Sequence, residues 1–125
     1  MIMSHAERHV VAVTTAADGT ATAYSPVLTG KLSQIRYVKT DFAAGVDFTI
    51  TAEATEETLW TQSDVNASAT VAPRQATHTT AGVAALYAGG GSAVLDKIAL
   101  ANDRVKIVIG SGGNAKTGAF HIVME

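Results

Sequence analysis

The sequence contains no cysteine, and this absence removes several kinds of chemistry at once. Thiol nucleophiles, thiolate metal sites and disulfide frameworks all need that residue. We therefore expect the fold to be held together by an apolar core or by association between chains.

An excess of basic residues and long hydrophobic runs are also missing. The chain has 9 Lys and Arg against 11 Asp and Glu, a net charge of -2, whereas neutralising a phosphate backbone requires a surplus of Lys and Arg. No apolar run approaches the ~18–20 residues of a membrane span, and Glu7 and Arg8 precede any apolar stretch. We expect a soluble protein without a signal peptide, with neither nucleic acid nor membrane as a partner.

The residues that are present favour sheet over helix. Hydrophobic residues make up 47% of the chain, and they are mostly Ala and Val rather than Leu, alongside abundant Thr. Val and Thr favour strands. The length of 125 residues suits a single domain that spans 1–125.

Apolar and polar residues alternate with a period of two in segment after segment, which predicts about eight short strands. Val105, Ile107 and Ile109, for example, alternate with Arg104 and Lys106. We find no convincing amphipathic helix, and Ala81–Leu86 is the only helical candidate. We therefore expect an all-β fold, a single-domain antiparallel β-sandwich that is jelly-roll-like. The alternation is clearest over Lys31–Lys39, Val46–Ala54, Thr58–Gln62, Asp103–Ile109 and Thr117–Met124.

Three turn signals predict hairpins, and one of them, Thr55-Glu56-Glu57, is expected to join the strand over Val46–Ala54 to a partner over Thr58–Gln62. Asp18-Gly19 is expected to join the strand over His5–Thr15 to a short partner strand over Thr20–Tyr24. The loop from Gly110 to Lys116 is expected to join the last two strands.

The loop from Gly110 to Lys116 also resembles a phosphate-binding loop of the form G-x-x-x-x-G-K-[ST], since it ends in Lys116-Thr117. However, Ala115 stands where the second Gly belongs, and a strand follows where the mechanism needs a helix N-terminus. We therefore interpret the loop as a hairpin tip that binds no nucleotide.

His5, Glu7 and His9 have the residue types of a divalent metal site and lie on one face of the first predicted strand. Residues i to i+4 along a strand span about 13 Å at ~3.3 Å per residue, which is too far for all three to reach one ion. The His-x-His order of cupin-like metalloenzymes is also absent. We expect a polar strand end that holds no metal.

No other constellation predicts catalysis. His78 and His121 have no partner in a recognisable nucleophile motif, and no G-x-S-x-G is present. Trp60 and Tyr87 are interpreted as core or interface anchors. We therefore expect no enzyme activity, no catalytic residue and no cofactor.

Several segments resemble small proteins encoded among the head genes of tailed bacteriophages. The similarity covers roughly residues 30–125, and the first 29 residues lie outside it. The segments that carry it are Gly30-Lys-Leu-Ser-Gln-Ile-Arg-Tyr-Val38, Val46-Asp-Phe-Thr-Ile-Thr51, Glu57-Thr-Leu-Trp60, Leu100-Ala-Asn-Asp-Arg-Val-Lys-Ile-Val108 and Gly113-Asn-Ala-Lys-Thr-Gly-Ala-Phe-His-Ile122.

The resemblance implies a jelly-roll-like decoration or cement protein, made in the bacterial host cytoplasm and attached to the outside of the virion capsid. Its partners would be the major capsid protein and copies of itself as a homo-oligomer. Arg104 and Lys106, on the polar side of their strand, are the residues we expect to contact the capsid. Two alternatives remain open: another virion component, such as a head-tail joining or tail protein, or a carbohydrate-binding β-sandwich.

Overall fold

The structure, a computed structural model, describes residues 5–125, and strands are its only extended regular elements. Residues 1–4, where the segment examined for a signal peptide begins, lie outside the described part. The strands are β1 (Glu7–Thr14), β2 (Ala21–Tyr24), β3 (Leu28–Lys39), β4 (Val46–Ala52), β5 (Thr58–Val65), β6 (Ala69–Val71), β7 (Arg74–Ala76), β8 (Leu95–Asp103), β9 (Val105–Gly110) and β10 (Thr117–Met124).

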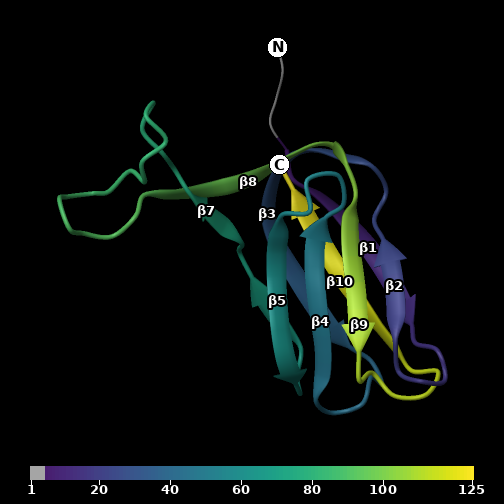
Figure 1. Cartoon of the computed structure of the whole chain (residues 1–125). Coiled ribbons are helices and arrows are strands. Elements are labelled where there is room, and N and C mark those ends of the chain that lie inside the picture. Colours follow the sequence, from purple (N-terminus) through teal and green to yellow (C-terminus); the bar gives the residue numbers. More distant parts are fainter. Residues whose placement is uncertain (1–4) are drawn as a thin grey trace.

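The strands form two antiparallel sheets that face each other (Figure 1). The first sheet has the order β1-β10-β3-β8-β7, and β6 also pairs with β3. The second has the order β2-β9-β4-β5. The predicted all-β, antiparallel β-sandwich is therefore confirmed, and the helical candidate Ala81–Leu86 forms no helix.

The core lies between the sheets and is built from the alternating apolar residues. Tyr37 of β3, Phe48 of β4 and Phe120 of β10 are at most 2% exposed. Their ring centroids lie 5.2 to 5.3 Å apart in each pairing, within the range that favours aromatic contact. Trp60 of β5 packs edge-on against Phe48 at 4.7 Å, which confirms its interpretation as a core anchor.

The hairpin predicted across Thr55-Glu56-Glu57 is confirmed, since β4 pairs with β5, but the other two predicted hairpins are wrong. β1 pairs with β10 while β2 pairs with β9 in the other sheet, and β9 and β10 are likewise in different sheets. The segments 15–20 and 111–116 therefore cross between the sheets. The error has a physical cause: alternation shows which residues face the core, and in a sandwich a strand of either sheet satisfies that pattern.

The two crossing segments run side by side. The amide of Gly112 donates to the carbonyl of Gly19 at 2.9 Å, and the amide of Thr15 donates to that of Lys116 at 2.8 Å. A Cβ on Gly112 would lie 2.7 Å from the Thr15 side chain. The glycines that resembled a phosphate loop therefore allow two backbone segments to approach closely.

Residues 5–29, the described part of the segment that the phage resemblance does not cover, belong to the sandwich. They supply one edge strand to each sheet, β1 and β2. Val11 and Val13 of β1 are 6% and 3% exposed, as the alternation predicts.

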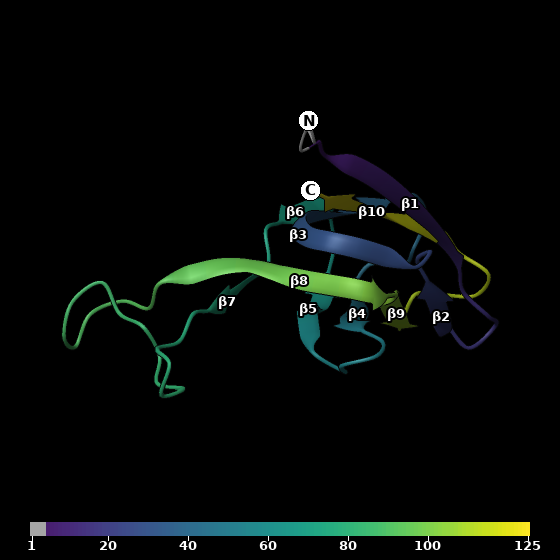
Figure 2. The same ribbon diagram turned by 90° about the horizontal axis from the view of Figure 1, so that it is seen from above.

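An arm, residues 74–97, extends from one end of the sandwich (Figure 2). It contains β7, the connection that follows and the first part of β8. Leu95–Lys97 of β8 pair with β7, whereas the rest of β8 pairs with β3 in the body. No residue of the arm is buried. The buried Pro73 lies at its base, between β6 and β7.

Candidate interaction surface

The outer face of the second sheet carries the two residues predicted to contact a partner. The register places Tyr24, Lys106 and Thr51 in one row across β2, β9 and β4. Thr22, Val108 and Thr49 form the next row. Tyr24 and Val108 are each 40% exposed. The face is therefore mixed in character, with apolar and hydroxyl groups beside cations. The opposite side of β9 is confirmed as core, since Val105, Ile107 and Ile109 are at most 1% exposed.

Arg104, between β8 and β9, is held by contacts on two sides. Its Nε and Nη2 donate to the carboxylate oxygens of Glu53 at 3.1 and 2.5 Å. Its guanidinium carbon lies 4.1 Å from the centroid of the Tyr24 ring, a cation–π distance. The hydrogen bonds to Glu53 raise the pKa of Arg104 above its ordinary value, so the guanidinium stays charged.

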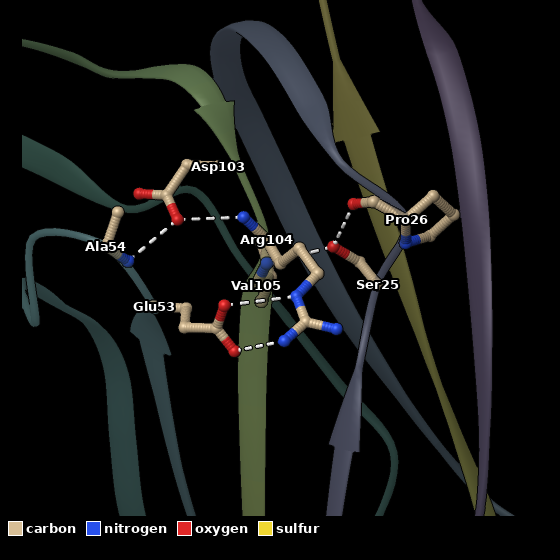
Figure 3. A network of polar contacts seen from close by, with 7 residues as sticks. All are labelled: Ser25, Pro26, Glu53, Ala54, Asp103, Arg104 and Val105. Carbon is tan, nitrogen blue, oxygen red and sulfur yellow. Dashed lines mark hydrogen bonds and ion pairs between the residues drawn. The ribbon is translucent and has the colours of Figure 1, made fainter.

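The backbone beneath Arg104 is fixed by two buried polar residues (Figure 3). The Asp103 carboxylate, 5% exposed, accepts hydrogen bonds from the amides of Ala54 and Arg104, each at 2.8 Å. Ser25 Oγ accepts from the amide of Val105 at 2.9 Å. These contacts tie β9 to the end of β4 and to β2. They give the Arg104 side chain a rigid base.

Arg104 and Lys106 differ in charge balance. Glu53 neutralises Arg104, whereas among residues 5–125 no carboxylate lies within 4.0 Å of the Lys106 amine. The structure therefore places both predicted contact residues on one face and leaves Lys106 as the cation open to a partner. That they contact a partner stays a prediction.

His5, Glu7 and His9 form a polar cluster at the start of β1. His5 Nε2 lies 2.9 Å and His9 Nε2 lies 3.5 Å from the carboxylate of Glu7. The hydrogen bond from His5 is the main cause that lowers the pKa of Glu7. Within the described residues, no group of three His, Asp or Glu side chains is arranged to hold a metal ion.

An open groove of about 640 Å³ lies near the base of the arm and is lined by residues that include Gly30, Lys31, Lys97 and Glu125. Lys97 and Glu125 form an ion pair. The Lys31 backbone exchanges two hydrogen bonds with that of Glu125, each at 2.9 Å. These contacts join the C-terminus to the base of the arm.

Sequence reasoning missed the arm as a surface. Tyr87 was expected to be an anchor in the core or at an interface; it is 77% exposed, so it is not a core residue, and its role at an interface stays a prediction. A signal was available, because residues 75–95 contain no Asp, Glu, Lys or Arg. An uncharged run of this length is unusual for a segment that is exposed to solvent.

No protein-family model, no curated protein and no solved structure matches this chain. Across residues 5–125 there is also no helix with the length and hydropathy needed to span a membrane.

Proposed function

We propose that this protein is a bacteriophage capsid decoration, or cement, protein. It binds the outer surface of the major capsid protein lattice and stabilises the head, and its sandwich is of the jelly-roll-like kind. The proposal rests first on the segments between Gly30 and Ile122 that resemble phage head proteins.

One structural observation supports the proposal most: the sandwich body has an outer sheet face of mixed apolar and polar side chains, and a long exposed arm extends from one of its ends (Figure 2). A protein that bridges lattice subunits needs a stiff scaffold with surfaces that point in different directions. Many copies on one lattice add their weak contacts as avidity, so each contact can be modest.

The test uses particles that lack the protein. Purified full-length protein is mixed with them, and co-sedimentation and resistance to heat or low salt are measured. The proposal expects binding and protection. It fails if the protein neither sediments with the particles nor protects them, in which case a connector, tail or carbohydrate-binding role takes its place.

Two variants test the proposed contact face. Lys106→Ala should weaken co-sedimentation several-fold without a change in melting temperature, because Lys106 is half-exposed and the core side of β9 is untouched. Arg36→Ala is the matched control, since Arg36 is an exposed cation on the other sheet whose guanidinium donates to Thr70 at 2.8 Å. Equal binding by both variants would contradict the assignment of this face.

A further inference from the structure

The arm exposes apolar side chains that its own body leaves uncovered. Val83, Leu86, Tyr87 and Leu95 are between 44% and 77% exposed. Leu86 forms an isolated bridge with Ala93, and Tyr87 begins the bend that follows. A group of exposed apolar residues on a projecting segment marks an interaction surface.

The arm is preformed by its own hydrogen bonds. The amide of Thr77 donates to the carbonyl of Val94, that of Val94 to Ala85, and that of Ala85 to Thr77, each at 2.9 Å. At the base, Arg74 Nη1 donates to the carbonyl of Ser33 at 3.1 Å. Association through the arm would therefore cost little ordering of the chain.

The charge pattern of the arm identifies the kind of partner. Residues 75–95 lack Asp, Glu, Lys and Arg, while Arg74, Asp96 and Lys97 mark its base. When identical surfaces meet, residues face copies of themselves or of their neighbours, and charges of one sign would repel. A neutral apolar surface is therefore suited to a second copy of itself.

Beyond its base, which carries Arg74, Asp96 and Lys97, the arm lacks the residues that commonly keep exposed edges apart. Exposed edges in monomeric proteins are commonly blocked by Lys, Pro or inward-pointing charges. Residues 75–95 contain no charged residue and no Pro. Nothing in this sequence therefore opposes pairing between two arms.

The exposed area of the chain shows that it departs from a compact shape. A compact monomer of 12.8 kDa exposes about 6300 Å², whereas this chain exposes 7022 Å². The arm is the described segment that departs most clearly from the compact body (Figure 2).

From these observations we infer that the arm, residues 74–97, is the surface through which copies of this chain associate, arm against arm. Within the proposed function, the arm would be the surface that joins neighbouring copies of the protein. It rests on the arm and not on attachment to a capsid, because it concerns association in solution without particles.

The first test is sedimentation of the full-length protein over a range from micromolar to millimolar concentration. The wild type should associate as concentration rises. The double variant Leu86→Ser/Tyr87→Ser should associate at least tenfold more weakly, with an unchanged circular dichroism spectrum and melting temperature. The control Val10→Ser/Val27→Ser alters body residues that are 56% and 57% exposed, and it should associate like the wild type.

The second test exploits the absence of native cysteine. Tyr87→Cys should be cross-linked to dimers by a bifunctional maleimide, whereas Val10→Cys should remain mostly monomeric. A wild type that stays monomeric at all concentrations overturns the inference, as does association that Leu86→Ser/Tyr87→Ser leaves unchanged. If the protein is monomeric and its arm is needed only for binding to particles, the capsid protein covers the arm. That result would also overturn the inference that arms associate with one another. Failure to bind particles, with arm-dependent association intact, would count against the capsid role alone.

Discussion

Gly118, in β10, lies against the ring of the buried Phe42. A Cβ at this position would approach Phe42 Cε2 to 2.4 Å, and Phe42 is 2% exposed with little room to move. Gly118→Ala should therefore destabilise the protein by ~1–3 kcal/mol through overpacking. Chemical denaturation measures the change in the free energy of unfolding.

Gly110→Ala is the matched control for that change. Nothing lies within 4 Å of a Cβ at Gly110, and its φ is not in the left-handed region. The substitution should leave stability unchanged or raise it slightly, since Ala restricts the unfolded chain more than Gly. A loss equal to that of Gly118→Ala would contradict the packing argument.

Asp41 links stability to pH. Its carboxylate accepts hydrogen bonds from the amide and hydroxyl of Thr117 at 2.5 and 2.9 Å, and these bonds lower its pKa below the ordinary 3.8. A carboxyl whose pKa is lowered by folding stabilises the protein above its ordinary pKa, and this contribution disappears as pH falls through the folded value.

Asp41→Asn should therefore be less stable than the wild type at neutral pH, and the difference should shrink as pH falls toward about 2. Melting temperatures across that range measure it. Glu57→Gln, at the exposed turn before β5, is the control. A difference between wild type and Asp41→Asn that stays constant with pH would contradict the assigned role.

At the scale of elements, β9 is a central strand of its sheet and lies between β2 and β4. Ile107 is 0% exposed, so Ile107→Ala removes buried contacts and leaves a cavity that costs ~2–5 kcal/mol. Its neighbour Lys106 points to the outer face, and Lys106→Ala should change stability by less than about 0.5 kcal/mol. Thermal or chemical denaturation compares the two. Equal losses would show that the burial pattern of β9 is misassigned.

The strands could be predicted from the sequence because burial imposes a period of two on their residues. The alternation of Phe48 and Ile50 with Thr49 marks β4 directly. The pairing of β4 with β5 could also be predicted, from the short polar turn between them, but the pairing of the first two and the last two strands could not. In this fold the connections that begin near Asp18 and Gly110 cross between sheets, and they are stabilised by contacts with each other, such as the one between Gly19 and Gly112. Contacts between distant segments leave no local signature.

Some features of the candidate surface could be predicted from the sequence, and others depend on contacts between distant residues. The positions of Arg104 and Lys106 on the outer side of β9 follow from alternation alone. The Glu53 carboxylate that pairs with Arg104 is 51 residues away in sequence, so sequence proximity could not reveal it. The arm was missed because its apolar residues show only a weak strand pattern. The informative feature was the absence of charged residues over residues 75–95.

At the scale of the whole molecule, the sandwich carries two candidate interaction surfaces. The outer face of the second sheet carries Arg104 and Lys106. The arm extends beyond the end of the body (Figures 1 and 2). In the proposed arrangement the sheet face contacts the capsid and the arms contact one another. Each kind of contact would then reinforce the other across the lattice.

A reconstruction of the phage particle that carries this protein tests the capsid role most directly. We predict density for the β-sandwich repeated over the outer surface of the head, with the face around Lys106 toward the capsid protein and the arms of neighbouring copies in contact. Density confined to the portal vertex or the tail, or none on the head exterior, would contradict the capsid role.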